Sequence, residues 1–328
     1  MRKFSFGFLF TRRLVTISSL VICVWIVIGI IIYRSTSFTL FSDNQIKIPS
    51  ETKPVGDEIE ACKRQNQKLS PLFWRRVNYY RKEIPEALSS SATKIAVHSN
   101  FTTFHVYSKI HYLYAKPDIK KNLSVLLLHG QSYTSETWDK LRTIQHIAAF
   151  GYYAVAVDLP GYGDSPDIKK LNRTGFLTSI IDSLNMENVV IISPSMSGSF
   201  SMEFLIGYST KMVGFVPVSP ISSKQLSKHP CKTPINFTSM HFDKDCQKLL
   251  PFLGKKSPPN LSCIKVPTLV VYGEQDKSKS SAKLCLLPNS QGAEIPNGEH
   301  AAYLSNPELW HKLLYNYLDT LNDVLPCI

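Results

Sequence analysis

Signatures of cofactor and metal binding are absent from this 328-residue sequence. Its glycines form neither the G-x-G-x-x-G pattern nor the P-loop pattern that places a phosphate at a helix N-terminus. Its nine histidines and seven cysteines do not have the spacing of a zinc site. We therefore expect no metal and no organic cofactor.

Acidic residues are few relative to basic ones, 25 against 37, which gives a net charge of +12. This excess does not indicate a nucleic-acid partner, because the basic residues do not gather into one recognition motif. Four of them, Arg2, Lys3, Arg12 and Arg13, instead precede a long apolar run. Low-complexity tracts are absent as well, and an apolar content of 44% supports a large packed core.

The apolar run covers residues 14–33 and contains no charged side chain. A helix of about 20 residues spans a hydrocarbon core of roughly 30 Å, whereas the apolar part of a cleaved signal peptide has only about 7–15 residues. By the positive-inside rule, residues 1–13 form a cytoplasmic tail, and residues 34–328 lie on the lumenal or extracellular side. The sequence thus predicts a single-pass type II membrane protein anchored in the lipid bilayer by residues 14–33.

Two counts agree with a domain in the secretory pathway. Five of the 15 asparagines begin Asn-x-Ser/Thr sequons, where about two would be expected by chance. These predicted glycosylation sites are Asn100, Asn122, Asn172, Asn236 and Asn260. Six of the seven cysteines follow the apolar run, which permits up to three disulfides in pairings that the sequence leaves open. Buried free thiols remain the alternative for Cys285 and Cys327.

Residues 34–93 form a predicted stem, because they are polar, mixed in charge and interrupted by prolines. Their segment 74–82 is basic and aromatic, so it could lie on anionic lipid. We favour the other interpretation, in which this segment is a solvated helix packed on the domain that follows.

Residues 94–328 form the predicted main domain. A hairpin is expected at residues 103–116, and buried strands then alternate with helices. Such alternation is typical of a mostly parallel, doubly wound α/β sheet with flanking helices. The strands are expected at residues 124–128, 153–158, 189–193, 214–219 and 268–273, and the helices at 138–150, 171–183, 197–208 and 307–325.

An insertion at residues 221–266 separates two of these strands by far more than an ordinary connection needs. It contains eight lysines, three cysteines and two sequons. We expect a disulfide-stapled, glycosylated, cap-like segment.

Ser195 is the candidate nucleophile. A nucleophile on a sharp strand-to-helix turn needs small residues two positions before and after it, and Ser193 and Ser197 fulfil this directly after the predicted strand. Ser193 itself has the bulky Ile191 at the position two before it, and Ser197 would follow the strand through a loose connection.

Asp276 and His300 are the expected partners of Ser195. Asp276 ends a Gly-x-x-Asp turn after a buried strand, at the sheet edge where ligands bind in open α/β folds. His300 follows on a Gly-containing loop, so the order along the chain is Ser, Asp, His, as in α/β-hydrolases. Glu274 is a rival acid but suits a turn position, and His129 is a rival base that more often fixes a loop.

These three residues predict acyl transfer without a cofactor. His300 would take the proton of Ser195 during attack on an acyl carbonyl, while Asp276 would orient the imidazole. The backbone amides of Gln131 and Met196 are the expected oxyanion hole. The expected substrate is a small acyl ester or acyl amide.

Several segments resemble the α/β-hydrolase domain-containing protein 14 family, and the Ser-Pro-Ser-x-Ser-Gly sequence at 193–198 is the most specific of them. The others are residues 125–130, 135–138, 151–161, 214–220 and 271–276. The resemblance extends from about residue 101 to the C-terminus and implies an α/β-hydrolase fold with its triad at Ser195, Asp276 and His300. It also implies a serine hydrolase of short acyl esters, anchored as in the membrane-bound A branch.

The same resemblance suggests alternatives. Lysine deacylation is associated with the soluble B branch, and an inactive hydrolase fold acting as an interaction module is a further hypothesis. The long stem and the enlarged segment 221–266 depart from the family, so the substrate does not simply transfer. The sequence leaves the oligomeric state open.

Overall fold

The computed structural model describes residues 53–65, 67–104, 108–228, 231–232, 241–254 and 258–327. The predicted cytoplasmic tail, the predicted anchor at residues 14–33 and Asn236 lie outside these residues. Within the described residues, no helix combines the length and apolarity needed to cross a bilayer. Residues Glu51–Ile328 form one compact unit.

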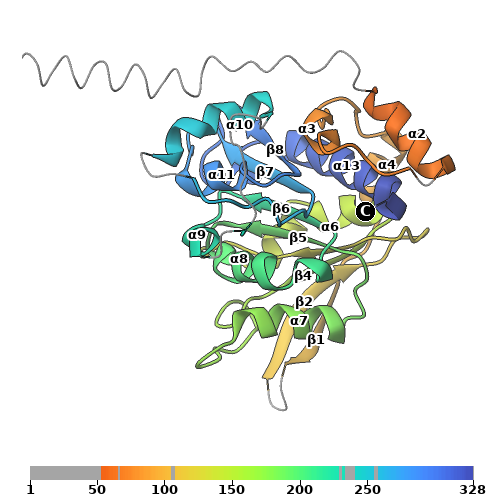
Figure 1. Cartoon of the computed structure of the whole chain (residues 1–328). Coiled ribbons are helices and arrows are strands. Elements are labelled where there is room, and N and C mark those ends of the chain that lie inside the picture. Colours follow the sequence, from red (N-terminus) through yellow and green to blue (C-terminus); the bar gives the residue numbers. More distant parts are fainter. Residues whose placement is uncertain are drawn as a thin grey trace, which may run out of the picture. The chain divides into compact units, whose positions relative to one another are not determined.

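An eight-stranded sheet runs through this unit in the order β1-β2-β4-β3-β5-β6-β7-β8 (Figure 1). The hairpin β1–β2 is antiparallel and joins β4 in antiparallel fashion, whereas the pairs among β3 to β8 are all parallel. The expected mostly parallel α/β sheet is therefore confirmed. The strands are β1 His98–Phe104, β2 Ser108–Ala115, β3 Ser124–Leu127, β4 Tyr153–Val157, β5 Val189–Pro194, β6 Gly214–Val218, β7 Thr268–Gly273 and β8 Ser290–Ile295.

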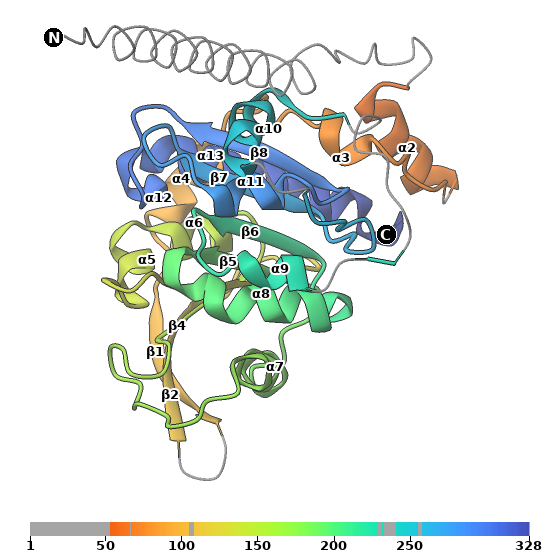
Figure 2. The same cartoon turned by 60° about the vertical axis from the view of Figure 1, so that its left-hand side comes forward.

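Helices cover both faces of the sheet (Figure 2). On one face Val189 and Ile191 of β5 pack in a core with α7 Arg173–Ser183 and α8 Gly198–Gly207. On the other face Val190 and Ile192 pack with α6 Thr143–Ala149 and α13 Pro307–Val324. Both faces of the central strands are thus buried, which explains their continuous apolar runs. The remaining helices are α2 Val55–Gln65, α3 Phe73–Arg76, α4 Glu86–Ala92, α5 Glu136–Lys140, α9 Lys224–Lys228, α10 Lys244–Leu249, α11 Lys279–Leu284 and α12 Ala302–Ser305.

The helix expected at residues 138–150 is interrupted. It divides into α5 and α6 at Arg142, which has a left-handed φ of 62°. The imidazole of His146 on α6 stacks on that of His311 on α13, with ring centroids 4.0 Å apart. Burial, followed by this neighbour, lowers the pKa of His311 to about 3, so His311 is a neutral core residue.

The described part of the predicted stem packs into the domain from residue 53 onward. Phe73, Trp74 and Tyr79 are at most 3% exposed and belong to the core that contains α13. Arg75 is also buried, where it donates hydrogen bonds to backbone carbonyls of residues 285, 287 and 288. Burial lowers the pKa of Arg75 to about 10, against the opposing charge of Asp243. Trp74 and Arg75 thus face the core and not lipid, so packing of segment 74–82 on the domain is confirmed. The expected helix is not, because α3 ends at Arg76.

The described part of the insertion covers the outer edge of β8. Asp243 accepts a hydrogen bond from the amide of Gly292 at 3.1 Å, and Asp245 accepts one from the amide of Glu294 at 3.3 Å. A Cβ atom at Gly292 would lie only 2.6 Å from the amide nitrogen of Cys246, so a glycine is needed there. Backbone groups of an edge strand that would otherwise be open are thus paired with the insertion.

Two of three disulfides tie these additions to the domain, and the other, Cys231–Cys263, lies within the insertion. The pairs are Cys62–Cys327, Cys231–Cys263 and Cys246–Cys285, with Cα–Cα distances of 6.0, 5.7 and 5.6 Å. Cys285 and Cys327 are therefore bonded rather than free thiols. The first pair joins the predicted stem to the C-terminal end of the domain, and the third joins α10 to the end of α11.

Replacing Cys246 and Cys285 together by alanine is expected to lower the free energy of unfolding by about 4 kcal/mol. The bond spans 39 residues, and both side chains are 0% exposed, so chain entropy and buried packing are lost together. Urea unfolding under non-reducing conditions measures the change. The matched control removes Cys231 and Cys263, which span a similar 32 residues but are not buried. A control that loses as much stability as the first variant would contradict the contribution of burial.

Candidate active site

Ser195 lies directly after β5, at the carboxyl end of the central strands. Its φ of 47° lies in the left-handed region, which a residue with a side chain rarely adopts. The carbonyl oxygen of Ser195 accepts a hydrogen bond from the amide of Ile221 at 2.9 Å. A Cβ atom at Gly198 would lie 2.4 Å from the carbonyl oxygen of Ile221, so only glycine allows this approach. The strained turn is therefore held by the segment that follows β6.

The structure brings Ser195, His300 and Asp276 into one hydrogen-bonded line. The Nε2 atom of His300 lies 2.8 Å from Oγ of Ser195, and its Nδ1 atom lies 2.6 Å from Oδ2 of Asp276. The side chain of His300 is 53% exposed and that of Asp276 26% exposed, so the line is open to solvent. This geometry allows a proton to pass from the hydroxyl to the imidazole.

The neighbouring serines point elsewhere. The hydroxyl of Ser193 lies 3.0 Å from that of Ser197 and 2.7 Å from that of Ser201, and all three residues are 0% exposed. Ser197 also donates to the carbonyl of Pro194. Of Ser193, Ser195 and Ser197, it is thus Ser195 whose hydroxyl contacts His300.

A pocket of about 400 Å³ opens over this line. Gln131 lines it, and a Cβ atom at Gly130 would lie 3.6 Å from Cβ of Ser195, so this segment passes close to the hydroxyl. Met196 directly follows Ser195 in a short 3-10 turn, and its sulfur accepts a hydrogen bond from Tyr162. The side chain of Met196 thus packs against Tyr162. Its backbone amide is the group that we expect in the oxyanion hole. The pocket is lined by Gly130, Gln131, Ser132, Tyr133, Pro194, Ser195, Glu299, His300, Ala301 and Tyr303.

The two rival residues have structural contacts. His129 is 0% exposed, and its Nε2 atom accepts a hydrogen bond from the amide of Leu159 at 2.9 Å. Burial lowers its pKa, so it stays neutral. Glu274 accepts a hydrogen bond from the amide of Asn297 at 2.9 Å, as a residue of the turn. His129 therefore fixes a loop, and Glu274 ties the turn after β7 to the loop that carries His300.

The turn after β7 and the loop that carries His300 approach each other closely. A Cβ atom at Gly273 would lie 2.2 Å from the carbonyl oxygen of Glu299, and the amide of Gln275 donates to the carbonyl of Gly298. Lys277, next to Asp276, forms an ion pair with Glu294 at 3.5 Å. The loop carrying Asp276 is thus held against β8 and the loop after it.

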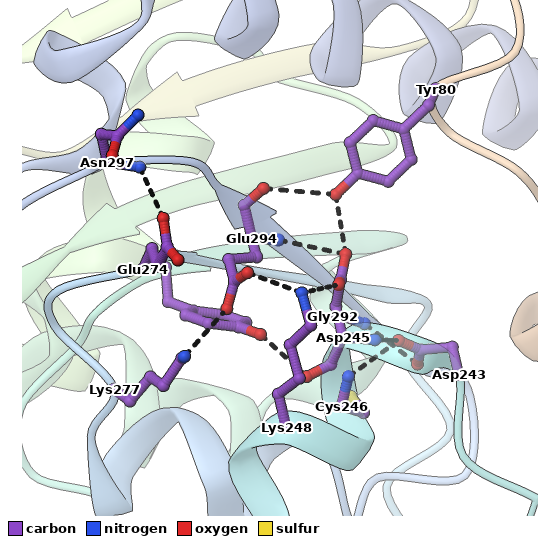
Figure 3. A network of polar contacts seen from close by, with 11 residues as sticks. Tyr80, Asp243, Asp245, Cys246, Lys248, Glu274, Lys277, Gly292, Glu294 and Asn297 are labelled. Carbon is purple, nitrogen blue, oxygen red and sulfur yellow. Dashed lines mark hydrogen bonds and ion pairs between the residues drawn. The ribbon is translucent and has the colours of Figure 1, made fainter.

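Glu294 belongs to a network of polar contacts that extends into the insertion and into the predicted stem (Figure 3). It pairs with Lys248 at 2.6 Å, and Tyr80 donates to the nearby Asp245 at 2.8 Å. Burial alone would raise the pKa of Glu294, but Lys248 and Lys277 together lower it, so the carboxylate stays ionised. The segments that depart from the family pattern therefore brace the sheet edge beside Asp276.

A second histidine–carboxylate pair, His111 and Asp158, is buried and holds the loop that follows β3. His111 Nδ1 lies 2.7 Å from Oδ2 of Asp158, and its Nε2 lies 2.8 Å from the hydroxyl of Ser99. Asp158 also accepts hydrogen bonds from the amides of Ser135 and Asp164. Burial opposes the charge of Asp158, yet these hydrogen bonds lower its pKa. Asp158 thus fixes the loop that includes Gln131, a role that we did not predict for His111.

The predicted glycosylation sites differ in exposure. Asn100, Asn122 and Asn172 are exposed, and Asn172 also caps α7 by accepting from the amide of Gly175. Asn260 is partly buried, and its amide nitrogen donates to the carbonyl of Cys231. Among the described residues, no group of three or more His, Cys, Asp or Glu side chains could hold a metal ion.

Comparison with known proteins agrees with this architecture. The family model "Alpha/beta hydrolase family" matches residues 125–243. A crystal structure of a predicted CIB-like hydrolase from Thermoplasma acidophilum superposes with a TM-score of 0.55 at 19% identity, over 68% of this chain and 98% of that one. A probable hydrolytic enzyme from Pseudomonas aeruginosa gives a TM-score of 0.51 at 19% identity, over 68% and 94%. These structures establish the α/β-hydrolase fold.

Relatives with higher identity establish the family. "Protein ABHD14A" of Danio rerio is 32% identical over 211 residues, which cover 62% of this chain and 67% of the relative. "Putative protein-lysine deacylase ABHD14B" of Homo sapiens is 36% identical over 206 residues, which cover 60% of this chain and 84% of the relative. The chain belongs to the ABHD14 family of the α/β-hydrolase superfamily.

Proposed function

We propose that this protein is a serine hydrolase that cleaves small acyl esters through Ser195, His300 and Asp276. The observation that carries the proposal is the single hydrogen-bonded line from hydroxyl to imidazole to carboxylate, which begins at a strained residue and borders a pocket. A pocket of about 400 Å³ suits a substrate of modest size.

In the proposed reaction, Oγ of Ser195 attacks the acyl carbonyl and His300 Nε2 accepts its proton. Asp276 keeps Nδ1 of His300 protonated and stabilises the imidazolium that forms. The amides of Gln131 and Met196 stabilise the oxyanion, and each such donor contributes about 3–4 kcal/mol in comparable sites. His300 then protonates the leaving alcohol, and the acyl group remains bound to Oγ of Ser195. Water attacks this acyl-enzyme while His300 accepts a proton from it. His300 returns the proton to Oγ of Ser195, and the carboxylic acid is released.

We also propose a type II membrane protein whose catalytic domain faces the lumen or the cell exterior. Support comes from the uncharged residues 14–33, the preceding basic residues and the exposed sequons. Three disulfides in the domain agree with an oxidising compartment.

Deacylation of a lysine side chain is the second candidate function. The relative named a putative protein-lysine deacylase is 36% identical, and the same three side chains could attack an acyl amide. Release of acetate from an acetyl-lysine peptide, measured with and without a thiol acceptor, separates this activity from ester hydrolysis. An interaction module without activity would show neither reaction.

Replacing Ser195 by alanine should abolish covalent labelling by a fluorophosphonate probe, because the probe reacts with an activated hydroxyl. Replacing Ser197 by alanine should preserve labelling, since its buried hydroxyl bonds Ser193 and Pro194 instead of His300. In-gel fluorescence of the purified variants provides the measurement. Labelling that persists without the Ser195 hydroxyl would refute the assignment of the nucleophile.

Replacing Asp276 by asparagine should leave the fold intact but reduce kcat on p-nitrophenyl acetate by roughly 10³–10⁴-fold. The amide preserves the size of a partly exposed side chain but favours the wrong tautomer of His300. The thermal midpoint and steady-state kinetics are compared with those of Glu274→Gln, which alters the rival acid and should retain most turnover. A larger loss of kcat in Glu274→Gln would assign the acid to the other residue.

Expression in eukaryotic cells should give a chain whose electrophoretic mobility increases after endoglycosidase treatment. Asn100 and Asn122 are exposed, so Asn100→Gln and Asn122→Gln should each remove part of this shift. A chain that carries no glycan at any sequon would argue against the proposed orientation.

A further inference from the structure

Tyr303 lines the pocket with a buried ring, and its hydroxyl has no hydrogen-bond partner in the described part of the chain. Among the described residues, four tyrosines are less than 2% exposed: Tyr152, Tyr272, Tyr303 and Tyr317. Three of them donate to backbone carbonyls, at 3.2 Å for Tyr152, 2.8 Å for Tyr272 and 2.8 Å for Tyr317. The hydroxyl of Tyr303 hydrogen-bonds to no described residue, although Tyr303 lines the pocket. The Tyr303 hydroxyl is also not among the fully buried polar atoms without a partner, so it is open to the pocket, unlike the hydroxyls of the other three tyrosines.

Aromatic packing holds the ring of Tyr303 in place. Its centroid lies 4.7 Å from that of Trp138 and 6.0 Å from that of Trp310. Trp138 is itself anchored, because its indole nitrogen donates to the carbonyl of Leu128 at 2.9 Å. Both tryptophans are 0% exposed. The position of the Tyr303 hydroxyl is therefore fixed before any substrate enters, as in other preorganised sites.

The position of Tyr303 links it to the reacting groups. It comes three residues after His300 and borders the same pocket as Ser195. Burial, and then the nearby Tyr133, raise the pKa of the Tyr303 phenol. The phenol thus remains protonated at neutral pH and can act as a hydrogen-bond donor.

We propose that Tyr303 determines specificity by donating a hydrogen bond to an oxygen atom that the substrate carries in addition to its reacting carbonyl. The substrate class is then short esters with an ether, hydroxyl or carbonyl oxygen in the acyl or the alcohol part. A hydrocarbon in the same position would leave the hydroxyl unpaired, and sites built to bond a polar group discriminate strongly against such analogues. This inference rests on the proposed hydrolase activity.

Matched ester pairs test the proposal with the full-length chain. In the first pair, an ether oxygen of p-nitrophenyl methoxyacetate replaces one methylene group in the acyl part of p-nitrophenyl butanoate. In the second pair, 2-methoxyethyl acetate has the same replacement in the alcohol part of butyl acetate. The ratio of kcat/KM within each pair is compared between the natural chain and Tyr303→Phe, so that intrinsic ester reactivity cancels. We expect Tyr303→Phe to lower the ratio about tenfold in one pair, while kcat/KM for the hydrocarbon ester changes less than about twofold.

Tyr133→Phe is the matched control, because it removes a hydroxyl from a half-buried tyrosine of the same pocket. Its ratios should change less than about twofold, since a half-buried hydroxyl can exchange its bond for water. An active, fluorophosphonate-labelled Tyr303→Phe with unchanged ratios in both pairs would overturn the inference and leave the hydrolase intact. An equal change in Tyr133→Phe would overturn it as well. A natural chain that hydrolyses no ester and is not labelled at Ser195 would instead refute the proposed function itself.

Discussion

The left-handed backbone at Ser195 is the constraint on which the site depends. A residue with a side chain is strained there, and such strain persists only where the surroundings enforce it. Here the amide of Ile221 bonds the Ser195 carbonyl, and the same segment passes so close that only glycine fits at position 198. The buried hydroxyls of Ser193 and Ser197 bond each other beneath the turn. The strain is thus balanced by contacts that turn one hydroxyl toward His300.

Charged groups at low exposure hold the loops around that hydroxyl. Asp158 joins the loop after β3 to the loop after β4, and Glu294 joins the turn carrying Asp276 to the insertion. Each carboxylate is compensated by several donors, which offsets the cost of its burial. Polar groups held this firmly position a site more accurately than exposed loops could.

The segments that distinguish this chain from the family pattern are structural additions around the sheet edge. The predicted stem contributes Trp74 to the core, and the insertion pairs with β8 through Asp243 and Asp245. None of the described residues of the insertion lines the pocket beside Ser195. The added segments therefore influence the site through the support of β7, β8 and their loops and through the bond from Ile221 to the Ser195 turn, whereas the pocket wall comes from the shared domain.

The sequence by itself determined the alternation of buried strands and helices, the position of the sharp turn at Ser195 and the order of its partners, because these follow from local periodicity and small residues. It also anticipated His129 and Glu274 as loop and turn residues. The tertiary structure alone decided the disulfide pairs, the burial of Trp74, the bond between His111 and Asp158 and the position of Tyr303 in the pocket wall. Those features join residues tens to hundreds of positions apart or depend on what surrounds one side chain, and no local pattern records which distant groups become neighbours when the sheet forms.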